Sequence, residues 1–377
     1  MSGRLTIIRG MHPFKDGVFS ALAHATGGAD WYKFIGMRAK PYPETNERAA
    51  YAFSRAKKMP RNPSTQKAKR QMIAAQYNWS RAHFTRHPGS VAVVWNGLGG
   101  SRMAYMLGAE DAGNPRLYVE LAPFAGHVTL DPEGLNAESS VPRTRGGLGD
   151  ATLGPVRKAR MANDLVARAA RGRNKPVGQN RRALPKSPFL FCPLQVPNDT
   201  QVQIFGGWAD TMPRFARILA RQADALPEGW HIRMKEHPSA RERITPLLEQ
   251  LAAASNGRVV IDNQSDTFDQ VRASQGVVTM NSSLALQSFL LDRPVIVTGE
   301  AFFAVPGLVD VAKSEEQLTA LFGQVETLQY DDAYRDALLG FLLDRYLVPY
   351  SEDDAGRLRI DRYRVLEKVE QARDLMA

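Results

Sequence analysis

The stretch "GWHIRMKEHPSA", Gly229 to Ala240, joins a short alternating run to an abrupt polar end. Apolar and charged residues alternate from 231 to 235, which predicts a half-buried strand. Pro238 cannot continue a central ladder, so the strand is expected to end at Lys-Glu-His-Pro. Ligands of open α/β sheets bind outside the carboxyl ends of the strands. Lys235 and His237 are therefore well placed to meet an anion, although His237 as a core histidine bonded to a carbonyl is the alternative.

Four further apolar runs accompany this strand after Ser187. They are "FLFCPLQ", "GRVVIDN", "SQGVVTMNSS" and "RPVIVTGEAFF", and helix-like segments lie between the runs at 211–225, 240–254, 266–273 and 283–291. This alternation is typical of βαβ units and of a parallel sheet covered by helices on both faces. We therefore predict a doubly wound α/β domain over residues 187–345.

The rest of the chain carries weaker signals. Strands are expected in "SVAVVWNG" (90–97) and "RLYVEL" (116–121), helices near 46–58 and 66–83, and a linker in the basic tract 171–187. The glycine-rich "NGLGGSR" is not a dinucleotide fingerprint, because Arg102 replaces its last glycine. We predict a first lobe over 1–186 and a C-terminal helical segment over 346–377 that packs back on it.

Length and composition suit a folded protein of two domains. The chain has 377 residues, of which 44% are hydrophobic, and a single cysteine, Cys192, which excludes an intrachain disulfide. No run of eighteen apolar residues occurs, and the N-terminus lacks the pattern of a secretory signal. We expect a cytoplasmic protein.

A net charge of +10 favours polyanionic partners without identifying one. Lys and Arg crowd residues 55–70 and 157–187, where they would serve as solvated helix faces, as a basic linker, or as contacts to an anionic inner membrane leaflet. No helix-turn-helix, zinc-finger or RNP-type signature is present, so we expect no nucleic-acid partner.

Polar residues gather after the strands of the second domain. They are Gln195, Asn198, Asp199 and Gln201 after the first, Lys235 and His237 after the second, and Asn281, Ser282 and Ser283 after the fourth. A helix that begins at Asn-Ser-Ser offers hydroxyl and backbone N–H groups to an anion, although a plain N-cap uses the same residues. Together with Lys and His at a neighbouring strand end, this pattern favours a phosphate site. No Asp-x-Asp occurs, so we expect no metal and no cofactor.

Carboxylates supply the remaining chemistry. Asp199 follows the first strand of the second domain, Glu120 ends the "RLYVEL" strand, and Asp131 in "LDPEGLN" is a third candidate. Each alone could be a surface charge. Glycosyl transfer through a covalent intermediate, however, needs a nucleophile on one side of the anomeric carbon and an acid/base group on the other.

Several ordered motifs resemble a known family. "VELAPFAGHVTLDPEGLNAESS", "PLQVPNDTQ", "KEHP" and "NSSLALQSFLLDRPVIVTGEAFFAVPGL" resemble the bacterial capsule polysaccharide biosynthesis and export family, over about residues 96–308. Characterised members of that family are retaining β-Kdo glycosyltransferases.

The resemblance implies a GT-B architecture of two Rossmann-like lobes, with the donor CMP-β-Kdo held mainly by the C-terminal lobe. It also implies Asp199 as nucleophile and Glu120 as acid/base. The donor-binding residues would be Gln195, Gln201, Lys235, His237, Asn281, Ser282, Ser283 and Gln287. The acceptor would be a glycan or glycolipid of capsule or lipopolysaccharide, with an anionic membrane surface as a further partner.

One departure bears on the donor. The family usually shows Ser-x-x-Gly-x-Glu-Ala at this helix, whereas Ala285 and Gln287 occupy the Gly and Glu positions here. An amide still binds a ribose hydroxyl, but without the strength of a charged acceptor. A transferase for another nucleotide sugar, such as a CMP-sialic acid, and a non-catalytic basic protein that binds polyanions are the alternatives.

Overall fold

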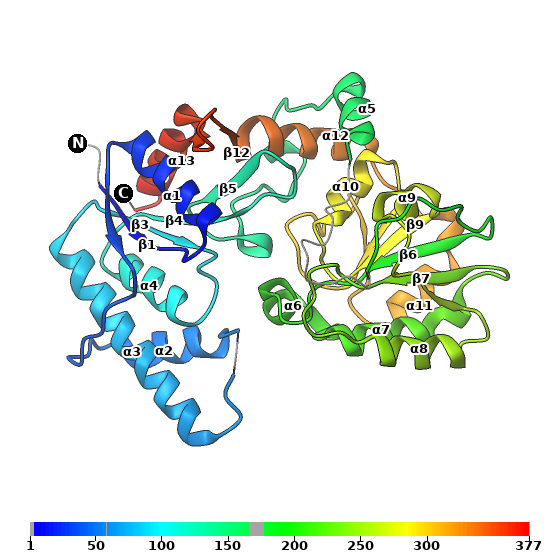
Figure 1. Cartoon of the computed structure of the whole chain (residues 1–377), viewed down its shortest axis with the longest axis horizontal. Coiled ribbons are helices and arrows are strands. Elements are labelled where there is room, and N and C mark those ends of the chain that lie inside the picture. The colour runs from blue at the N-terminus through cyan, green and yellow to red at the C-terminus, as the bar shows by residue number, and fades with distance from the viewer. Residues whose placement is uncertain (1–3, 58, 166–176, 377) are drawn as a thin grey trace. The chain divides into compact units, whose positions relative to one another are not determined.

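The computed structural model describes residues 4–57, 59–165 and 177–376. The chain divides into two compact units (Figure 1). The first comprises Met1–Val141 and Leu342–Ala377, and the second comprises Pro142–Phe341. Both are α/β units built around a sheet, which confirms the predicted fold class. The first unit ends well before residue 186, the boundary expected from the sequence.

The first unit contains a seven-stranded sheet among its described residues, in the order β13-β12-β5-β4-β3-β1-β2. The strands are β1 (Leu5–Ile8), β2 (Ala29–Tyr32), β3 (Val91–Trp95), β4 (Arg116–Leu121), β5 (His127–Asp131), β12 (Leu347–Glu352) and β13 (Leu358–Ile360). Strands β2, β1, β3 and β4 are parallel, whereas β5 is antiparallel to β4 and to β12. The carboxyl ends of β1 to β4 therefore lie at one edge of this sheet.

Helices cover both faces of the first sheet. They are α1 (Pro13–Thr26), α2 (Thr45–Ser54), α3 (Pro63–Arg86), α4 (Gly100–Asp111) and α13 (Arg362–Asp374). Helices α1 and α13 contact each other and share a core with alternate residues of the strands, such as Ile7 and Val93. Helices α2, α3 and α4 form a second cluster around Ile73 and Tyr77.

The second unit contains a parallel sheet in the order β11-β10-β9-β6-β7-β8 among its described residues. The strands are β6 (Phe189–Pro193), β7 (His231–Lys235), β8 (Val259–Ile261), β9 (Gly276–Thr279), β10 (Val295–Val297) and β11 (Asp310–Val311). The first five are the apolar runs identified in the sequence, so the predicted doubly wound sheet is confirmed. The strand order changes direction at β6, from which β7 and β8 follow on one side and β9 to β11 on the other, so the carboxyl ends of the parallel strands β6 and β9 lie beside each other.

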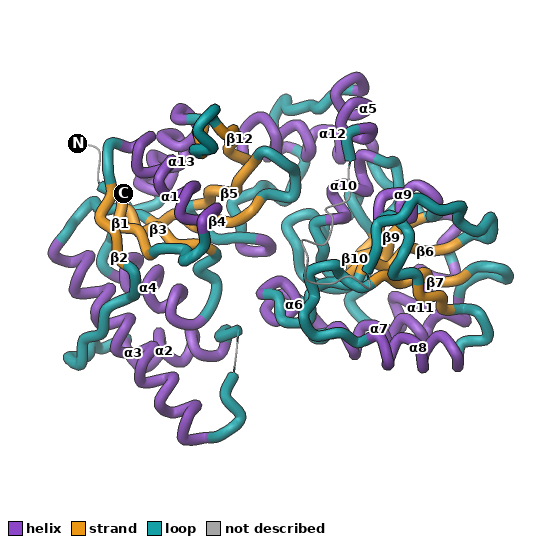
Figure 2. Tube along the Cα trace, viewed as in Figure 1, coloured by secondary structure: helices purple, strands orange, loops and turns teal. Residues whose placement is uncertain are grey.

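The helices of the second unit lie on both faces of its sheet (Figure 2). They are α5 (Pro155–Asn163), α6 (Thr200–Phe205), α7 (Met212–Gln222), α8 (Thr245–Ala254), α9 (Thr267–Ala273), α10 (Leu284–Leu290), α11 (Glu315–Gly323) and α12 (Asp332–Phe341). One hydrophobic core includes Ile232, Met234 and Phe215, and it joins one face of the sheet to α7, α8 and α11.

Two segments take places that the local pattern did not indicate. Of the basic tract expected to be a linker, residues 166–176 lie outside the described residues. Gly178 nevertheless donates its N–H to the Asn263 carbonyl at 2.7 Å, so the following residues pack on the second unit. The segment 346–377 was expected to be helical, but its first part forms β12 and β13, and only its end forms α13. All of residues 342–377 group with the first unit.

Candidate functional site

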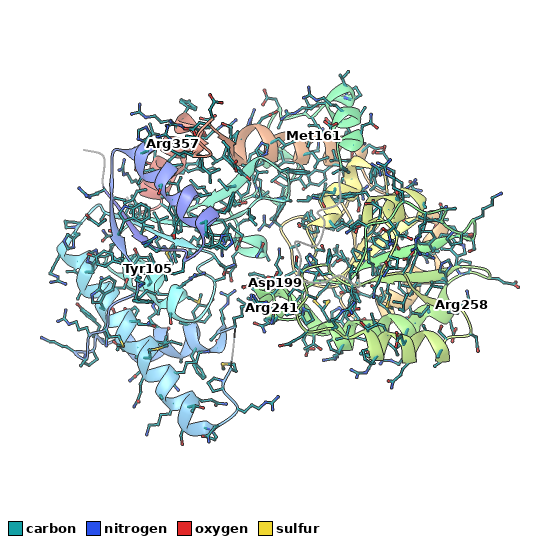
Figure 3. All side chains as sticks on the ribbon, in the orientation of Figure 1. Tyr105, Met161, Asp199, Arg241, Arg258 and Arg357 are labelled. Carbon is teal, nitrogen blue, oxygen red and sulfur yellow. The ribbon has the colours of Figure 1, made fainter. Side chains whose placement is uncertain are left out.

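The carboxyl ends of β6, β7 and β9 form a polar edge in the second unit. These three strands are neighbours in the sheet, with β6 in the middle. In Figure 3, Asp199, which follows β6, lies at one end of this unit, and Arg258, which precedes β8, lies at the other. The residues after each strand therefore meet at the same end, as expected for ligands of a parallel sheet.

An amide pair joins the ends of β6 and β9. Gln195 donates from Nε2 to Asn281 Oδ1 at 2.8 Å, and the Asn281 backbone N–H donates to Gln195 Oε1 at 3.3 Å. Asn281 Nδ2 donates to the carbonyls of Gln201 and Phe205 at 2.9 and 2.8 Å. Asn281 is 0% exposed, so its amide acts inside the protein and holds α6 in place. Asn281 therefore shapes the edge from inside, whereas Gln195 is half-buried and keeps a second Nε2 hydrogen.

Asp199 begins α6 and keeps one oxygen available. Its Oδ1 accepts from the Gln201 backbone N–H at 3.2 Å, as an N-cap residue does. Its Oδ2 accepts no hydrogen bond from a described residue. Asp199 is half-buried, so this oxygen is able to meet a bound molecule.

His237 presents an N–H group near Asp199. The Ala240 N–H donates to the His237 carbonyl at 3.0 Å in a turn with Pro238 at its second position. The Ser239 N–H donates to His237 Nδ1 at 3.1 Å. Burial lowers the pKa of His237, and the Asp199 carboxylate acts in the opposite direction. The neutral ring therefore carries its proton on Nε2, which makes no hydrogen bond with a described residue.

Lys235 is committed to the protein interior. Its Nζ donates to the carbonyls of Gly178, Asn263 and Ser265 at 2.7, 3.3 and 2.7 Å, and the residue is 2% exposed. An ammonium group has three donors, and all three are used. The prediction that Lys235 itself meets a phosphate is corrected accordingly: it fastens two segments against β7.

Glu236 continues this internal network and explains the polar end of the strand. It is buried and accepts from the Ile244 N–H, the Thr245 hydroxyl and Asn263 Nδ2 at 2.9, 2.5 and 2.9 Å. Lys235 and Glu236 therefore fix the loops around β7, and the turn at His237 follows directly after these two anchored residues. The alternation of the strand alone did not indicate that Glu236 has this role.

The remaining predicted donor-binding residues lie around this edge. Ser282 accepts from the Leu284 N–H at 3.2 Å, whereas the Ser283 hydroxyl makes no hydrogen bond with a described residue. The Gln201 side-chain amide likewise has no partner among the described residues. Gln287 lies half-buried on α10. Ser283 and Gln201 thus retain free hydrogen-bonding groups, as a binding site requires.

Glu120 ends β4 at the corresponding edge of the first unit. Its Oε1 accepts from Trp95 Nε1 at 2.9 Å and from the Leu121 N–H at 3.0 Å, and its Oε2 accepts from Asn96 Nδ2 at 3.1 Å. Glu120 is half-buried. Because Oε2 holds only one donor, it is the oxygen with room for a further hydrogen bond.

Two cations that the sequence did not indicate, Lys15 and Arg102, lie near this carboxylate. Lys15 Nζ lies 4.7 Å from the centre of a Trp95 ring, and Arg102 donates to the Trp95 carbonyl at 3.0 Å. Burial lowers the pKa of Lys15, Glu120 raises it, and Arg102 and Lys57 lower it further. Lys15 and Arg102 each lie in the first turn of a helix that follows a parallel strand. That position was the only feature of the sequence that could have identified them.

Asp131 has a structural environment. It is 0% exposed and accepts from the Glu133, Gly134 and Ser140 N–H groups and from the Ser140 and Tyr346 hydroxyls, at 2.8 to 3.0 Å. With five donors and no accessible surface, this carboxylate cannot approach a substrate. The third catalytic candidate is therefore corrected to a residue that ties the loop after β5 to the C-terminal segment.

No group of three or more His, Cys, Asp or Glu side chains in residues 4–57, 59–165 and 177–376 is placed to hold a metal ion. None of the helices in these ranges is both long enough and apolar enough to cross a bilayer.

The amino-acid sequence is similar to one family model and to several known relatives. Residues 156–343 match the family model described as capsule polysaccharide biosynthesis protein. Protein FixF of Sinorhizobium fredii is 28% identical over 285 residues, which cover 73% of this chain and 62% of FixF. Capsule polysaccharide modification protein LipB of Neisseria meningitidis is 29% identical over 128 residues, which cover 32% of this chain and 30% of LipB. The chain thus spans less than two thirds of either relative.

A solved structure extends the similarity to the fold. Thermosulfurimonas dismutans KpsC, beta Kdo 2,7 transferase, is similar to this chain with a TM-score of 0.50 and 15% sequence identity, over 80% of this chain and 90% of that one. The two Rossmann-like lobes predicted from the sequence, the GT-B fold class, are confirmed by this likeness.

Proposed function

We propose that this chain, whose residues 156–343 match the capsule polysaccharide biosynthesis family, is a retaining β-Kdo glycosyltransferase. It would move Kdo from CMP-β-Kdo to a glycan or glycolipid acceptor of a bacterial surface polysaccharide. The observation that carries the proposal is the polar edge of the second unit. There the loop after β6 is joined to the end of β9 through Gln195 and approaches the end of β7 through Asp199.

The donor would lie against this edge. His237 Nε2–H would donate to the phosphate of CMP, with Gln201 and Ser283 as further hydrogen-bonding groups. Arg241, in the loop after β7, lies at the same end of the unit as Asp199 (Figure 3) and forms no ion pair with a described residue. A free cation there would supply the charge that Lys235 cannot, and donors aimed at a departing phosphate lower the barrier to its release.

Asp199 would act as the nucleophile. In the first step its free Oδ2 would form a bond to C2 of Kdo while the C2–O bond to the phosphate breaks and CMP leaves with the electron pair. In the second step an acceptor hydroxyl would attack C2, and the bond to Asp199 would break to regenerate the carboxylate. Two displacements at one carbon give net retention.

Glu120 would take the proton of the acceptor hydroxyl. Its Oε2 has room for this hydrogen bond, and Lys15 and Arg102 lie close enough to the side chain to balance its negative charge. Phosphate is a good leaving group, so little acid assistance is needed in the first step. We therefore propose that Glu120 acts mainly in the second step.

Trapping the intermediate tests both assignments. In Glu120→Gln the first step should proceed and the second should slow, so incubation with CMP-β-Kdo should give a Kdo adduct on Asp199 in the intact mass spectrum. The double variant Asp199→Asn/Glu120→Gln is the matched control and should give none. Asp199→Asn alone should lower turnover at least about 1000-fold while CMP affinity changes less than about twofold. An adduct that survives in the double variant, or a product of inverted configuration, would contradict the mechanism.

The donor sugar needs its own test because Gln287 departs from the family pattern. Incubation with a panel of CMP-linked and uridine-linked sugars should give slow hydrolysis of CMP-β-Kdo alone, and this should persist after EDTA treatment if no metal takes part. Preferential hydrolysis of a CMP-sialic acid would reassign the donor. Salt-sensitive oligonucleotide binding with no donor hydrolysis would support the non-catalytic alternative.

A further inference from the structure

The first unit exposes three large apolar side chains beside its carboxyl edge. Phe34 and Met37, in the loop between β2 and α2, are 70% and 68% exposed, and Met11, in the loop after β1, is 58% exposed. The Arg9 N–H donates to the Tyr32 carbonyl at 2.9 Å, so the two loops start side by side. We call Met11, Phe34 and Met37 the apolar rim.

The loop that carries Phe34 and Met37 is held firmly. It runs along α3 (Figure 1), where the Arg38 N–H donates to the Ala75 carbonyl at 2.9 Å and Asn78 Nδ2 donates to the Arg38 carbonyl at 3.3 Å. Gly36 lies so close to Trp79 that a Cβ atom would come within 2.3 Å of the indole. The exposure of the rim is therefore imposed by an anchored backbone, and large exposed apolar groups of this kind mark interaction sites.

Cations flank the apolar side chains. Lys33, Arg38 and Lys40 lie in the same loop, and residues 31–43 contain no acidic residue. None of the three forms an ion pair with a described residue. Lys33 Nζ lies 5.5 Å from the Phe34 ring centre. Exposed apolar side chains with cations in the same loop match an anionic bilayer, where acyl chains lie beneath negative headgroups.

We propose that the apolar rim, with Lys33, Arg38 and Lys40, docks the first unit on an anionic lipid bilayer. Three side chains expose far less than the about 800 Å² per partner of a stable protein interface, so a bilayer is favoured over a second copy or another protein. Met11 also lies just before α1, whose Lys15 stands beside Glu120. Docking would therefore bring the Glu120 edge to the membrane. That the acceptor is lipid-linked rests on the proposed function, whereas the docking does not.

Vesicle flotation tests the surface. The full chain should float with vesicles of 30% phosphatidylglycerol and 70% phosphatidylcholine, and much less with phosphatidylcholine alone. Phe34→Ser and Met37→Ser should each weaken partitioning about tenfold, since moving one such side chain out of water changes a binding constant by roughly that factor. Tyr363→Ser, which alters a 77% exposed aromatic on α13, is the matched control and should bind like wild type.

The charges are tested separately. Lys33→Gln/Lys40→Gln should weaken binding to the anionic vesicles about 25-fold, at roughly fivefold per cation, and leave binding to neutral vesicles unchanged. Lys313→Gln, in the second unit, serves as the control for a lost surface charge. All of these positions are exposed, so the thermal unfolding of the variants should match wild type.

Insertion of the apolar rim into the bilayer can be measured by the fluorescence of a tryptophan placed in it. Phe34→Trp should show a blue shift and quenching by brominated lipids in anionic vesicles, whereas Tyr363→Trp should not. Failure of wild type to float, or flotation unaffected by the rim variants, would overturn the proposal. Size-exclusion chromatography in which Phe34→Ser dissociates a dimer would assign the rim to a second copy instead. Donor hydrolysis without vesicles reports the proposed function independently of these outcomes.

Discussion

Replacing Lys235 with methionine separates an internal fastening from a contact to the donor. Methionine keeps most of the apolar stem of the side chain but removes the ammonium group. The carbonyls of Gly178, Asn263 and Ser265 would lose their shared donor. The segment at 177–180 and the loop after β8 would then no longer be tied to β7.

The size of the effect follows from two opposing contributions. Three hydrogen bonds from a charged donor contribute about 1.5 to 3 kcal/mol each, or roughly 4.5 to 9 kcal/mol together. Burial lowers the pKa of Lys235 from 10.5 to about 8, which corresponds to a cost of about 3 kcal/mol for keeping the group charged at neutral pH. The variant is relieved of that cost. The net loss of stability should be about 1.5 to 6 kcal/mol.

Calorimetry and titration with CMP together distinguish an internal role of Lys235 from a contact to the donor. The unfolding temperature of Lys235→Met should fall by roughly 10 °C, at about 2 to 4 °C per kcal/mol for a unit of this size. CMP affinity, measured at a temperature where the variant is folded, should change less than about threefold. His237→Ala should behave oppositely, with unchanged unfolding and CMP binding weakened about tenfold. A Lys235→Met protein of full stability that has lost CMP binding would refute the internal role and restore Lys235 as a phosphate ligand.

Three further outcomes follow from buried polar groups. Asn281→Ala should lower the free energy of unfolding by about 3 kcal/mol in urea and also weaken CMP binding, because α6 loses its anchor; unchanged stability would argue against the link to Gln195. Asp131→Asn should destabilise by about 3 kcal/mol while turnover per folded molecule stays near wild type, and a stable but inactive variant would make the residue catalytic. Burial lowers the pKa of His83 to about 4, so between pH 4 and 6.5 the unfolded chain binds more protons and stability falls as the pH falls, by about 3 kcal/mol in total. His83→Phe should lack this loss, and equal urea midpoints across pH 4.5 to 6.5 for both proteins would contradict it.

Most strands and helices of the second unit could be predicted from local sequence patterns. Parallel strands covered on both faces appear as short apolar runs, and β6 to β10 are those runs with boundaries shifted by a few residues. The helices between them were also placed correctly. The first unit was less readable because β12 and β13 join its sheet from more than 200 residues away, through pairing such as Leu347 with Thr129. Pairing at that separation leaves no periodic trace near either strand.

The candidate site divides in the same way. Asp199, His237 and Glu120 were predicted at strand ends, and the structure leaves each with an atom that can still accept or donate a hydrogen bond. The cations Lys15 and Arg102 were missed because each is ordinary in its own helix and becomes notable only beside Glu120.

By itself the amino-acid sequence determined the order of strands and helices in the second unit and the polar residues that follow each strand. Only the tertiary structure decided which of those residues remain available to a ligand. The hydrogen-bonding groups of three of them are taken up by partners as far as 57, 86 and 215 positions away, for Lys235, Asn281 and Asp131 respectively. A buried donor or acceptor must be satisfied, and its partner is chosen by packing, so residue type and spacing cannot reveal whether it faces inward.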